Sequence, residues 1–293
     1  ASQPARWTEL VALLKDRTAS TVIDSLVKEL ASKGALGVLR HGFKCYGKTL
    51  RLAYFRPNSG LNPEAAARHR ANRFTITRQV AFTSEVLKGP DGAKRKCIID
   101  VVLSLNGLPV ATAELKNPFT GQRAEDACRQ YRTDRDGRDL LFRFKERALV
   151  HFAVDSDEVW MTTQLKGADT LFLPFNRGSG FGAGNPPVEG NWKTHYLWDE
   201  VLAADSLLDI LQRFMHLEAS ERQIETPTGV RTVRKEAMIF PRYHQLDAVR
   251  RLVSHAAAHG AGRNYLIQHS AGSGKSNTIA WLAHRLAPLH DAD

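Results

Sequence analysis

Two carboxylates and a lysine occur at a spacing that suits hydrolysis of a phosphodiester bond. Asp100 lies in the apolar run CIIDVVLSL, and Glu114 and Lys116 lie in the alternating run PVATAELK that follows it. Mg²⁺ takes one or two carboxylates together with water and a substrate phosphate oxygen. Lys116 shares a strand face with Glu114, so it can reach the attacking water or the charge that develops on phosphorus. We predict a Mg²⁺ site at Asp100 and Glu114, with Lys116 as a catalytic residue.

The hairpin between these two runs sets a geometric condition. If Asn106-Gly107 alone formed its loop, Asp100 would lie opposite Ala113 and would face away from Glu114. We therefore expect an odd-numbered loop or a β-bulge between residues 103 and 112. Asp100 and Glu114 interrupt otherwise apolar runs, where unpaired charge is costly to bury, and this favours a functional site. The alternative is an edge strand with a solvated charged face.

A helix expected over residues 121–134 follows the hairpin. Its apolar stripe consists of Ala124, Ala127, Cys128 and Tyr131. Gln130 on this helix could face the carboxylates as a further catalytic residue. The alternative is a solvated polar face at Gln130 with Tyr131 in the core.

A Gly-rich turn late in the chain has the sequence of a phosphate-binding loop. A strand expected over 264–269 precedes the turn HSAGSGKS, and a helix expected over 277–286 follows it, which is the order that a P-loop requires. Backbone N–H groups and the helix dipole favour phosphate there. His269 stands where the GxxxxGK[ST] pattern has its first glycine, and a chance Gly-rich turn is the alternative. The expected nucleotide contacts are Gly272, Ser273, Gly274, Lys275 on the phosphates and Ser276 on Mg²⁺.

Gln245 is a further nucleotide-binding candidate. It lies in the run FPRYHQ, at the start of a helix expected over 243–259. Its amide offers one donor and one acceptor, which match the N6/N7 edge of adenine. The alternative is an ordinary exposed glutamine near a helix start.

Composition narrows the class of protein. The 293 residues are 43% hydrophobic and 25% charged, which excludes overall disorder and favours about two folded domains. No apolar run of about 18 residues occurs, so we expect no membrane partner. Three cysteines without a CxxC pair argue against a disulfide framework or a zinc site and favour the cytoplasm. Lysine and arginine number 41 against 31 acidic residues, a net charge of +10 that favours nucleic acid as the partner.

The remaining elements indicate an α/β fold with a mixed sheet flanked by helices. We expect an amphipathic helix over 20–33, ended by Gly34 and Gly37, and a strand pair over 149–154 and 158–163. A surface loop is expected over 176–187, and a helix over 196–217. The polar segment 218–235 predicts a linker between two domains.

With these residues identified, the chain resembles the R (restriction, motor) subunit of type I restriction-modification enzymes. The resemblance covers nearly the whole chain and rests on its two motif regions and on several further runs: NRF, TRQ, IIDVVLSLNGLPVATAELKN, the 175–187 loop, YLWDEVL, FPRYHQ and HSAGSGKS. It implies a PD-(D/E)xK endonuclease-like domain over 1–217, a linker over 218–235 and the N-terminal part of a RecA-like superfamily 2 motor domain over 236–293. No DExx box follows Ser276, so we expect that motor domain to be truncated.

The resemblance also assigns roles by position. Asp100, Glu114 and Lys116 match the nuclease residues of the family, and Gln130 matches the glutamine of its Q-x-x-x-Y motif, although Asp134 stands at the tyrosine position. The implied function is that of an Mg²⁺-dependent type I site-specific deoxyribonuclease, which cleaves double-stranded DNA after ATP-driven translocation. Its implied cofactors are Mg²⁺ and ATP, and its implied partners are the methyltransferase (M) and specificity (S) subunits. The alternatives are a DNA-repair nuclease–helicase and a non-catalytic DNA-binding module that anchors a motor.

Overall fold

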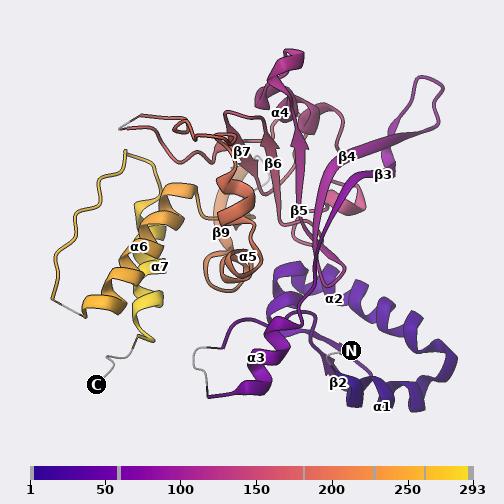
Figure 1. Cartoon of the computed structure of the whole chain (residues 1–293). Helices are drawn as coiled ribbons and strands as arrows, with labels where there is room; N and C mark the ends of the chain where they lie inside the picture. The colour runs from indigo at the N-terminus through magenta and orange to yellow at the C-terminus, as the bar shows by residue number, and fades with distance from the viewer. Residues whose placement is uncertain (1–2, 58–60, 181, 227–228, 261, 290–293) are drawn as a thin grey trace.

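A six-stranded mixed sheet lies at the centre of the structure (Figure 1). The computed structural model describes residues 3–57, 61–180, 182–226, 229–260 and 262–289. The strand order is β3-β4-β5-β6-β7-β8, and every neighbouring pair is antiparallel except β5 and β6, which run parallel. The strands are β3 (Phe74–Lys88), β4 (Lys94–Leu105), β5 (Leu108–Leu115), β6 (Val150–Val154), β7 (Val159–Thr162) and β8 (Leu173–Pro174). The expected α/β class with a mixed sheet is confirmed.

The turn between β4 and β5 contains the predicted irregularity. Asn106 and Gly107 have positive φ values of 50° and 88°, as a tight hairpin turn requires. The register then shifts, because Ser104 pairs with Pro109 whereas Leu103 pairs with Ala111. Val110 is the extra residue, so the expected bulge between 103 and 112 is confirmed.

Helices flank the sheet on both faces. Residues of the N-terminal helices pack in the main core on one face of the sheet, next to strands β4 and β5. Helix α4 covers the other face. The N-terminal elements are α1 (Pro4–Leu14), the turn η1 (Lys15–Arg17), α2 (Thr18–His41), β1 (Phe43–Cys45), β2 (Lys48–Leu50) and α3 (Pro63–Arg70). Later in the chain come the turn η2 (Pro118–Thr120), α4 (Ala124–Thr133) and the turn η3 (Leu140–Phe142).

Gly34 separates two helical segments within α2. Its φ of 74° and ψ of 164° are not helical, and the helical turns continue to His41. A Cβ atom at this position would lie 2.9 Å from the carbonyl oxygen of Lys145. The expectation that the helix ends at Gly34 is confirmed, because two helical segments meet at a kink there. The expectation for Gly37 was wrong, because the second segment continues through it to His41.

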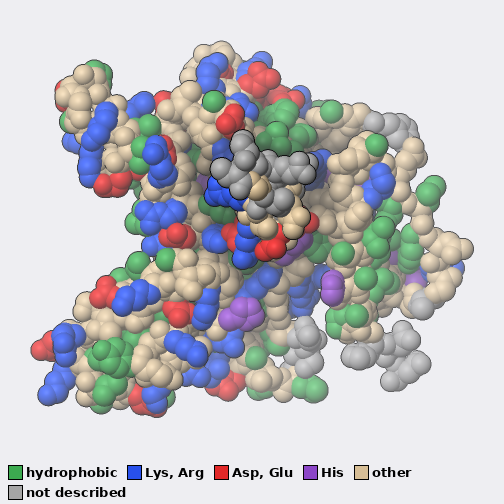
Figure 2. Space-filling view, turned by 180° about the vertical axis from the view of Figure 1, so that it is seen from behind, with side chains coloured by type: hydrophobic (Ala, Val, Ile, Leu, Met, Phe, Trp, Pro, Cys, Tyr) green, Lys and Arg blue, Asp and Glu red, His purple; other side chains and the backbone are tan. Residues whose placement is uncertain are grey.

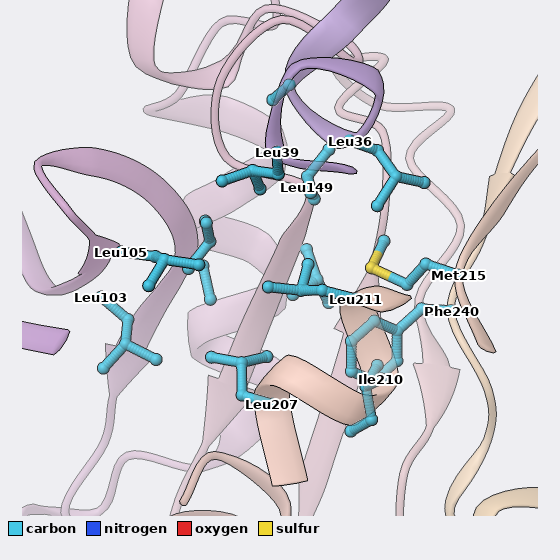
Figure 3. Packing of buried hydrophobic residues seen from close by; sticks show 14 of the residues in the cluster. Leu36, Leu39, Leu103, Leu105, Leu149, Leu207, Ile210, Leu211, Met215 and Phe240 are labelled. Atoms are coloured by element: carbon cyan, nitrogen blue, oxygen red, sulfur yellow. The ribbon is translucent and has the colours of Figure 1, made fainter. Parts of the chain in front are cut away.

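The main core lies on one face of the sheet. Figure 3 shows side chains from α2, β4 and the segment around 207–215 that converge there, among them Leu39, Leu103 and Leu211. Full burial of a leucine side chain stabilises a fold by about 1.5–3 kcal/mol. A second, smaller cluster lies on the opposite face and is centred on Tyr131 of α4. The site residues described below extend from this second face.

The C-terminal part of the chain differs most from expectation. The helix expected over 196–217 is divided into the π-helical turn η4 (Leu197–Val201), α5 (Ala204–Asp209) and the π-helical turn η5 (Ile210–Phe214). The expected linker 218–235 forms most of a long antiparallel hairpin of β9 (His216–Thr226) and β10 (Gly229–Ile239). The domain division remains a prediction, and Met238 and Phe240 pack in the main core with the sheet.

Two helices follow the hairpin, α6 (Tyr243–His259) and α7 (Lys275–Leu286). The strand expected over 264–269 was wrong, because residues 262–270 form no helix or strand. No neighbouring strand is present there among the described residues to pair with its backbone groups. The structure therefore shows no RecA-like sheet in the part that it describes, and Trp281 of α7 instead donates from Nε1 to the carbonyl oxygen of Phe214, at 2.9 Å.

The surface is hollowed at the edge of the molecule beside the β3–β4 hairpin. Figure 2 shows a wide notch between the protruding β3–β4 hairpin and the N-terminal helices, with Lys and Arg side chains gathered along the hairpin. No helix within the described ranges is long and apolar enough to cross a membrane.

Candidate nuclease centre and phosphate-binding loop

The structure brings Asp100 and Glu114 together where β4 diverges from β5. Val101 pairs with Ala113, so the next position places Asp100 beside Glu114. Asp100 accepts two hydrogen bonds, from the backbone N–H of Leu115 to Oδ2 at 2.8 Å and from Nε2 of Gln79 to Oδ1 at 3.0 Å. The Asp100 carboxylate thus occupies the place where a strand carbonyl would accept the Leu115 N–H.

Arg135, which no sequence motif marks as a site residue, holds the Glu114 side chain. Both side chains are buried, and Nη2 and Nε of Arg135 lie 2.6 and 2.9 Å from Oε1 of Glu114. Nη2 also donates to the carbonyl oxygen of Ile98 in β4, at 2.5 Å. Arg135 thereby fixes the position of Glu114 relative to the strand that carries Asp100.

The electrostatics of Glu114 are dominated by burial. Desolvation raises its pKa to about 7, the Arg135 guanidinium opposes this shift, and the nearby Asp100 carboxylate adds to it. Its second oxygen, Oε2, is buried and has no hydrogen-bond partner. An unpaired buried oxygen beside a second carboxylate is a place where a cation would remove an energetic penalty.

Lys116 and Gln130 contact each other just beyond the end of β5. Nζ of Lys116 donates to Oε1 of Gln130 at 2.6 Å, and the backbone N–H of Lys116 continues the pairing to Val154. Helix α4, which carries Gln130, is fixed at its start because the N–H of Ala124 donates to the buried carboxylate of Asp155, at 2.9 Å. Gln130 therefore contacts the lysine that we predicted to be catalytic.

Tyr131 lies in the core and not in the site. It is fully buried, and its hydroxyl lies 2.8 Å from Oγ1 of Thr112, which lies 2.8 Å from Nδ1 of His151. Burial raises the pKa of Tyr131 well above its ordinary value and lowers that of His151 to about 3, so both side chains are neutral near pH 7. This neutral chain of hydrogen bonds fastens α4 to the sheet and so positions Gln130.

The donor set fits Mg²⁺ better than a transition metal. Two carboxylates lie together, and one of them has an orphaned buried oxygen. Among the residues that the structure describes, no group of three or more His, Cys, Asp or Glu side chains could hold a metal ion. Mg²⁺ needs only one or two carboxylates because water and substrate oxygens complete its shell.

The phosphate-binding sequence forms a turn directly before α7. Gly272 and Gly274 have φ values of 71° and 80°, which glycine adopts without strain. Nζ of Lys275 donates to the carbonyl oxygens of Ser270 at 2.9 Å and of His269 at 3.3 Å. Ser276 is exposed in the first turn of the helix, whereas Ser273 is buried. The loop and the helix of the expected motif are present, and the preceding strand is absent.

Gln245 connects α6 to this turn. The side chain is buried, its Oε1 accepts the N–H of Arg242 at 2.9 Å, and its Nε2 donates to the carbonyl oxygen of Gly274 at 2.8 Å. It is therefore not the exposed glutamine of the alternative interpretation. Its amide contacts the protein at both ends, and a role in adenine binding remains a prediction.

Comparison with known proteins identifies the part of the chain that carries the carboxylates. Residues 60–170 match the family described as type I restriction enzyme R protein N terminus. This part of the chain is similar to that family. The match to the type I R protein includes Asp100, Glu114, Lys116, Gln130 and Arg135, and it ends before the phosphate-binding loop. Neither the curated proteins nor the solved structures contain a match to the chain.

The R-protein match and the geometry concern the same elements. β3, β4, β5, α4, β6 and β7 all lie within residues 60–170. Arg135 lies just beyond the C-terminal end of α4, and the only signal that could have identified it is its place in the charged run DRDGRD, which also reads as a solvated loop. Long-range pairing of this kind is not visible in local periodicity.

Proposed function

We propose that the chain carries the Mg²⁺-dependent DNA endonuclease centre of a type I restriction enzyme R subunit. The observation that carries this proposal is that Asp100 lies beside Glu114, with Lys116 two residues after Glu114, within the stretch that matches the R protein family. Residues 1–217 would form this nuclease domain, and the reaction would be hydrolysis of DNA phosphodiester bonds after translocation.

Asp100 and Glu114 would hold the metal ion through their carboxylates. Mg²⁺ bound there would polarise the phosphoryl oxygen and make the attacking water more acidic. Arg135 retains Glu114 by one oxygen and leaves the other available. Lys116, steadied by Gln130, would donate a hydrogen bond to the charge that develops on the phosphate.

The net positive charge and the match to the R protein family support the partners that we propose. The net charge of +10 suits double-stranded DNA, whose phosphates dominate the affinity of basic proteins. The R protein family supports a complex with methyltransferase (M) and specificity (S) subunits. Cys45, Cys97 and Cys128 are all free and buried, which suits the reducing cytoplasm that we propose as the location.

We further propose that residues 236–293 belong to the RecA-like motor part of the same enzyme, after a boundary at 218–235. ATP would bind at Gly272, Ser273, Gly274, Lys275 and Ser276, with the Lys275 ammonium against the β- and γ-phosphates and Ser276 on the accompanying Mg²⁺. Gln245 would act on the nucleotide only after one of its two protein contacts is released.

The test is nicking of supercoiled plasmid by the chain with Mg²⁺ and with EDTA. We expect nicking in the presence of Mg²⁺ and none in EDTA. The Asp100→Ala chain should not nick the plasmid in either condition. Asp24→Ala, which removes an exposed carboxylate from α2, is the matched control and should nick as the wild-type chain does. An Asp100→Ala chain that still nicks would overturn the assignment, and a wild-type chain that binds DNA without nicking it would favour the non-catalytic anchor.

A further inference from the structure

Two exposed aromatic side chains meet beside the proposed nuclease centre. Phe119 is 85% exposed and Trp192 is 59% exposed. They come from segments far apart in the sequence, yet their ring centroids lie 6.4 Å apart at an interplanar angle of 66°. Exposed aromatic residues that stand alone, such as Trp7 and Tyr46, need no explanation, whereas Phe119 and Trp192 together form a contiguous exposed apolar surface.

The two rings border a cleft that opens at the catalytic lysine. Its lining includes Lys116, Leu115, Trp198 and the two aromatic residues. Leu115, which is 41% exposed, also lines the groove that contains Asp100. The cleft and the groove that contains Asp100 therefore share Leu115 in their linings.

The aromatic residues are held on anchored turns. The N–H of Phe119 donates to Oδ1 of Asn117 at 3.0 Å within the turn η2. On the other side, Oγ1 of buried Thr194 donates to the carbonyl oxygen of Asp155 at 2.8 Å, and the N–H of His195 donates to the carbonyl oxygen of Trp192 at 3.1 Å. Both rings are thus presented at defined positions, which reduces the entropy lost on binding.

The lining of the cleft includes Lys116 and the carboxylate of Asp155, and a neighbouring ion-pair group has two cations and one carboxylate. Asp157 forms ion pairs with both Arg123 and Lys193, at 3.1 and 2.7 Å, so one carboxylate faces two cations. The Asp155 carboxylate is buried and accepts backbone N–H groups from Ala124, Asp157 and Glu158. With Lys116 added, the surroundings suit an anionic ligand that also has an apolar flat face.

We propose that this aromatic cleft stacks an unpaired nucleobase of the DNA strand that is being cut. Phe119 follows Lys116 by three residues, so their Cα atoms lie within about 11 Å, a span of one to three nucleotides at about 3.4 Å each. A base in intact duplex has both faces covered by its neighbours, so the occupant is single-stranded or locally opened DNA. The inference rests on the proposed nuclease function and adds to it a preference for opened strands near the scissile phosphate.

The experiment measures binding of a fluorescein-labelled 12-nucleotide single strand and of the matching duplex, in EDTA so that no cleavage occurs. Phe119→Ala and Trp192→Ala should each weaken single-strand binding by about five- to 150-fold, and duplex binding by less. Trp192→Phe and Phe119→Trp should retain binding, because they keep an aromatic face. Trp7→Ala and Tyr46→Ala, which remove exposed rings from α1 and the β1–β2 turn, are controls that should bind as the wild-type chain does.

The outcomes separate this inference from the proposed function. Single-strand binding by Phe119→Ala and Trp192→Ala at the level of Trp7→Ala overturns the cleft even if the chain nicks plasmid. Unchanged DNA binding combined with lost assembly with the methyltransferase assigns the cleft to a protein partner and also overturns it. Lost single-strand binding in a chain that never nicks plasmid retains the stacking cleft and rejects the nuclease.

Discussion

The candidate nuclease region (residues 60–170) and the candidate phosphate-binding region (residues 264–286) each contain a recognisable sequence motif. Only in the first region are all the expected neighbouring strands and helices present. Asp100 and Glu114 lie on two strands of a six-stranded sheet, and Lys116, just beyond the second strand, contacts Gln130 of a helix that is fastened to the sheet. Lys275 lies on a helix whose preceding segment forms no strand. A motif thus defines which groups can do chemistry, and the surrounding backbone decides whether they are held in place.

The two regions differ in how far along the chain a strand must look for the strand that pairs with it. β4 and β5 pair through a two-residue turn, so most of their contacts are local in sequence. A strand before the phosphate-binding loop would need neighbouring strands on at least one side, and the described residues provide none there. Lys275 meanwhile donates to carbonyl oxygens of its own loop.

The largest predicted effects are on strand cleavage and on ATP turnover, which should be lost separately by substitutions in the two regions. They are measured in the enzyme assembled with its partner subunits. Asp100→Ala should lower strand cleavage by at least about 100-fold, because loss of groups that only orient a metal ligand already costs about 10–100-fold, while ATP turnover continues. Lys275→Ala should abolish ATP turnover and the cleavage that depends on translocation. Gel assays of strand breaks and a coupled ATPase assay measure both. An Asp100→Ala enzyme that still cuts, or a Lys275→Ala enzyme that still translocates, would contradict separate sites.

Removal of Arg135 should be the most damaging change to the stability of the nuclease region. Arg135→Met leaves the Glu114 charge buried without its partner, which costs about 3–5 kcal/mol of unfolding free energy. Urea unfolding at pH 8.5, where Glu114 is ionised, measures this loss. Arg138→Met, at an exposed arginine three positions further along, should unfold nearly as the wild-type chain does. Equal midpoints for the two variants would show that the buried pair is not formed.

Stability should depend on the ionisation of Glu114. Its pKa of about 7 in the folded chain lies above the ordinary value of 4.5, so the folded state binds this proton more tightly than the unfolded state does. The contribution is full below pH 4.5 and is lost as the pH rises through 7, by about 3 kcal/mol. Glu114→Gln should remove this dependence between pH 4.5 and 7 from urea unfolding curves. Parallel pH profiles for the two proteins would refute the shift.

The smallest effect concerns the link between α6 and the phosphate-binding loop. Gln245→Ala removes two buried hydrogen bonds at a helix start and should cost about 1–2 kcal/mol. Hydrogen exchange should show faster exchange in α6 and α7 with the central sheet unchanged. Gln122→Ala, at an exposed glutamine, is the control. Equal acceleration in the sheet would mean that the two regions unfold as one unit.

The parts of the fold that sequence predicts are those whose signals are local. Asn106-Gly107 indicated the hairpin, and the alternating run after it indicated β5. The need to bring Asp100 and Glu114 to one face required an irregularity, which the structure places at Val110. The apolar stripe of α4 also holds, since Tyr131 and its three companions are buried. For the candidate site, this local information predicts that Asp100 lies beside Glu114, as the structure shows, and the catalytic roles of these residues, Lys116 and Gln130 remain predictions.

What the sequence did not reveal depends on contacts between distant residues or on faces without apolar contrast. Arg135 reaches Glu114 and Ile98 from beyond the end of a helix. The sequence does not mark the β9–β10 hairpin, because charged residues occupy both alternating sets of positions along 216–239, so hydrophobicity shows no period of two there. The aromatic cleft joins Phe119 to Trp192 across loops whose approach only the fold determines.

The most direct test of the central claim is to locate a metal ion in crystals of the chain soaked with Mn²⁺, which scatters anomalously where Mg²⁺ does not. We predict an anomalous peak between the carboxylates of Asp100 and Glu114 that disappears in crystals of Asp100→Asn. A peak elsewhere with none at this pair, or an unchanged peak in the variant, would contradict the account.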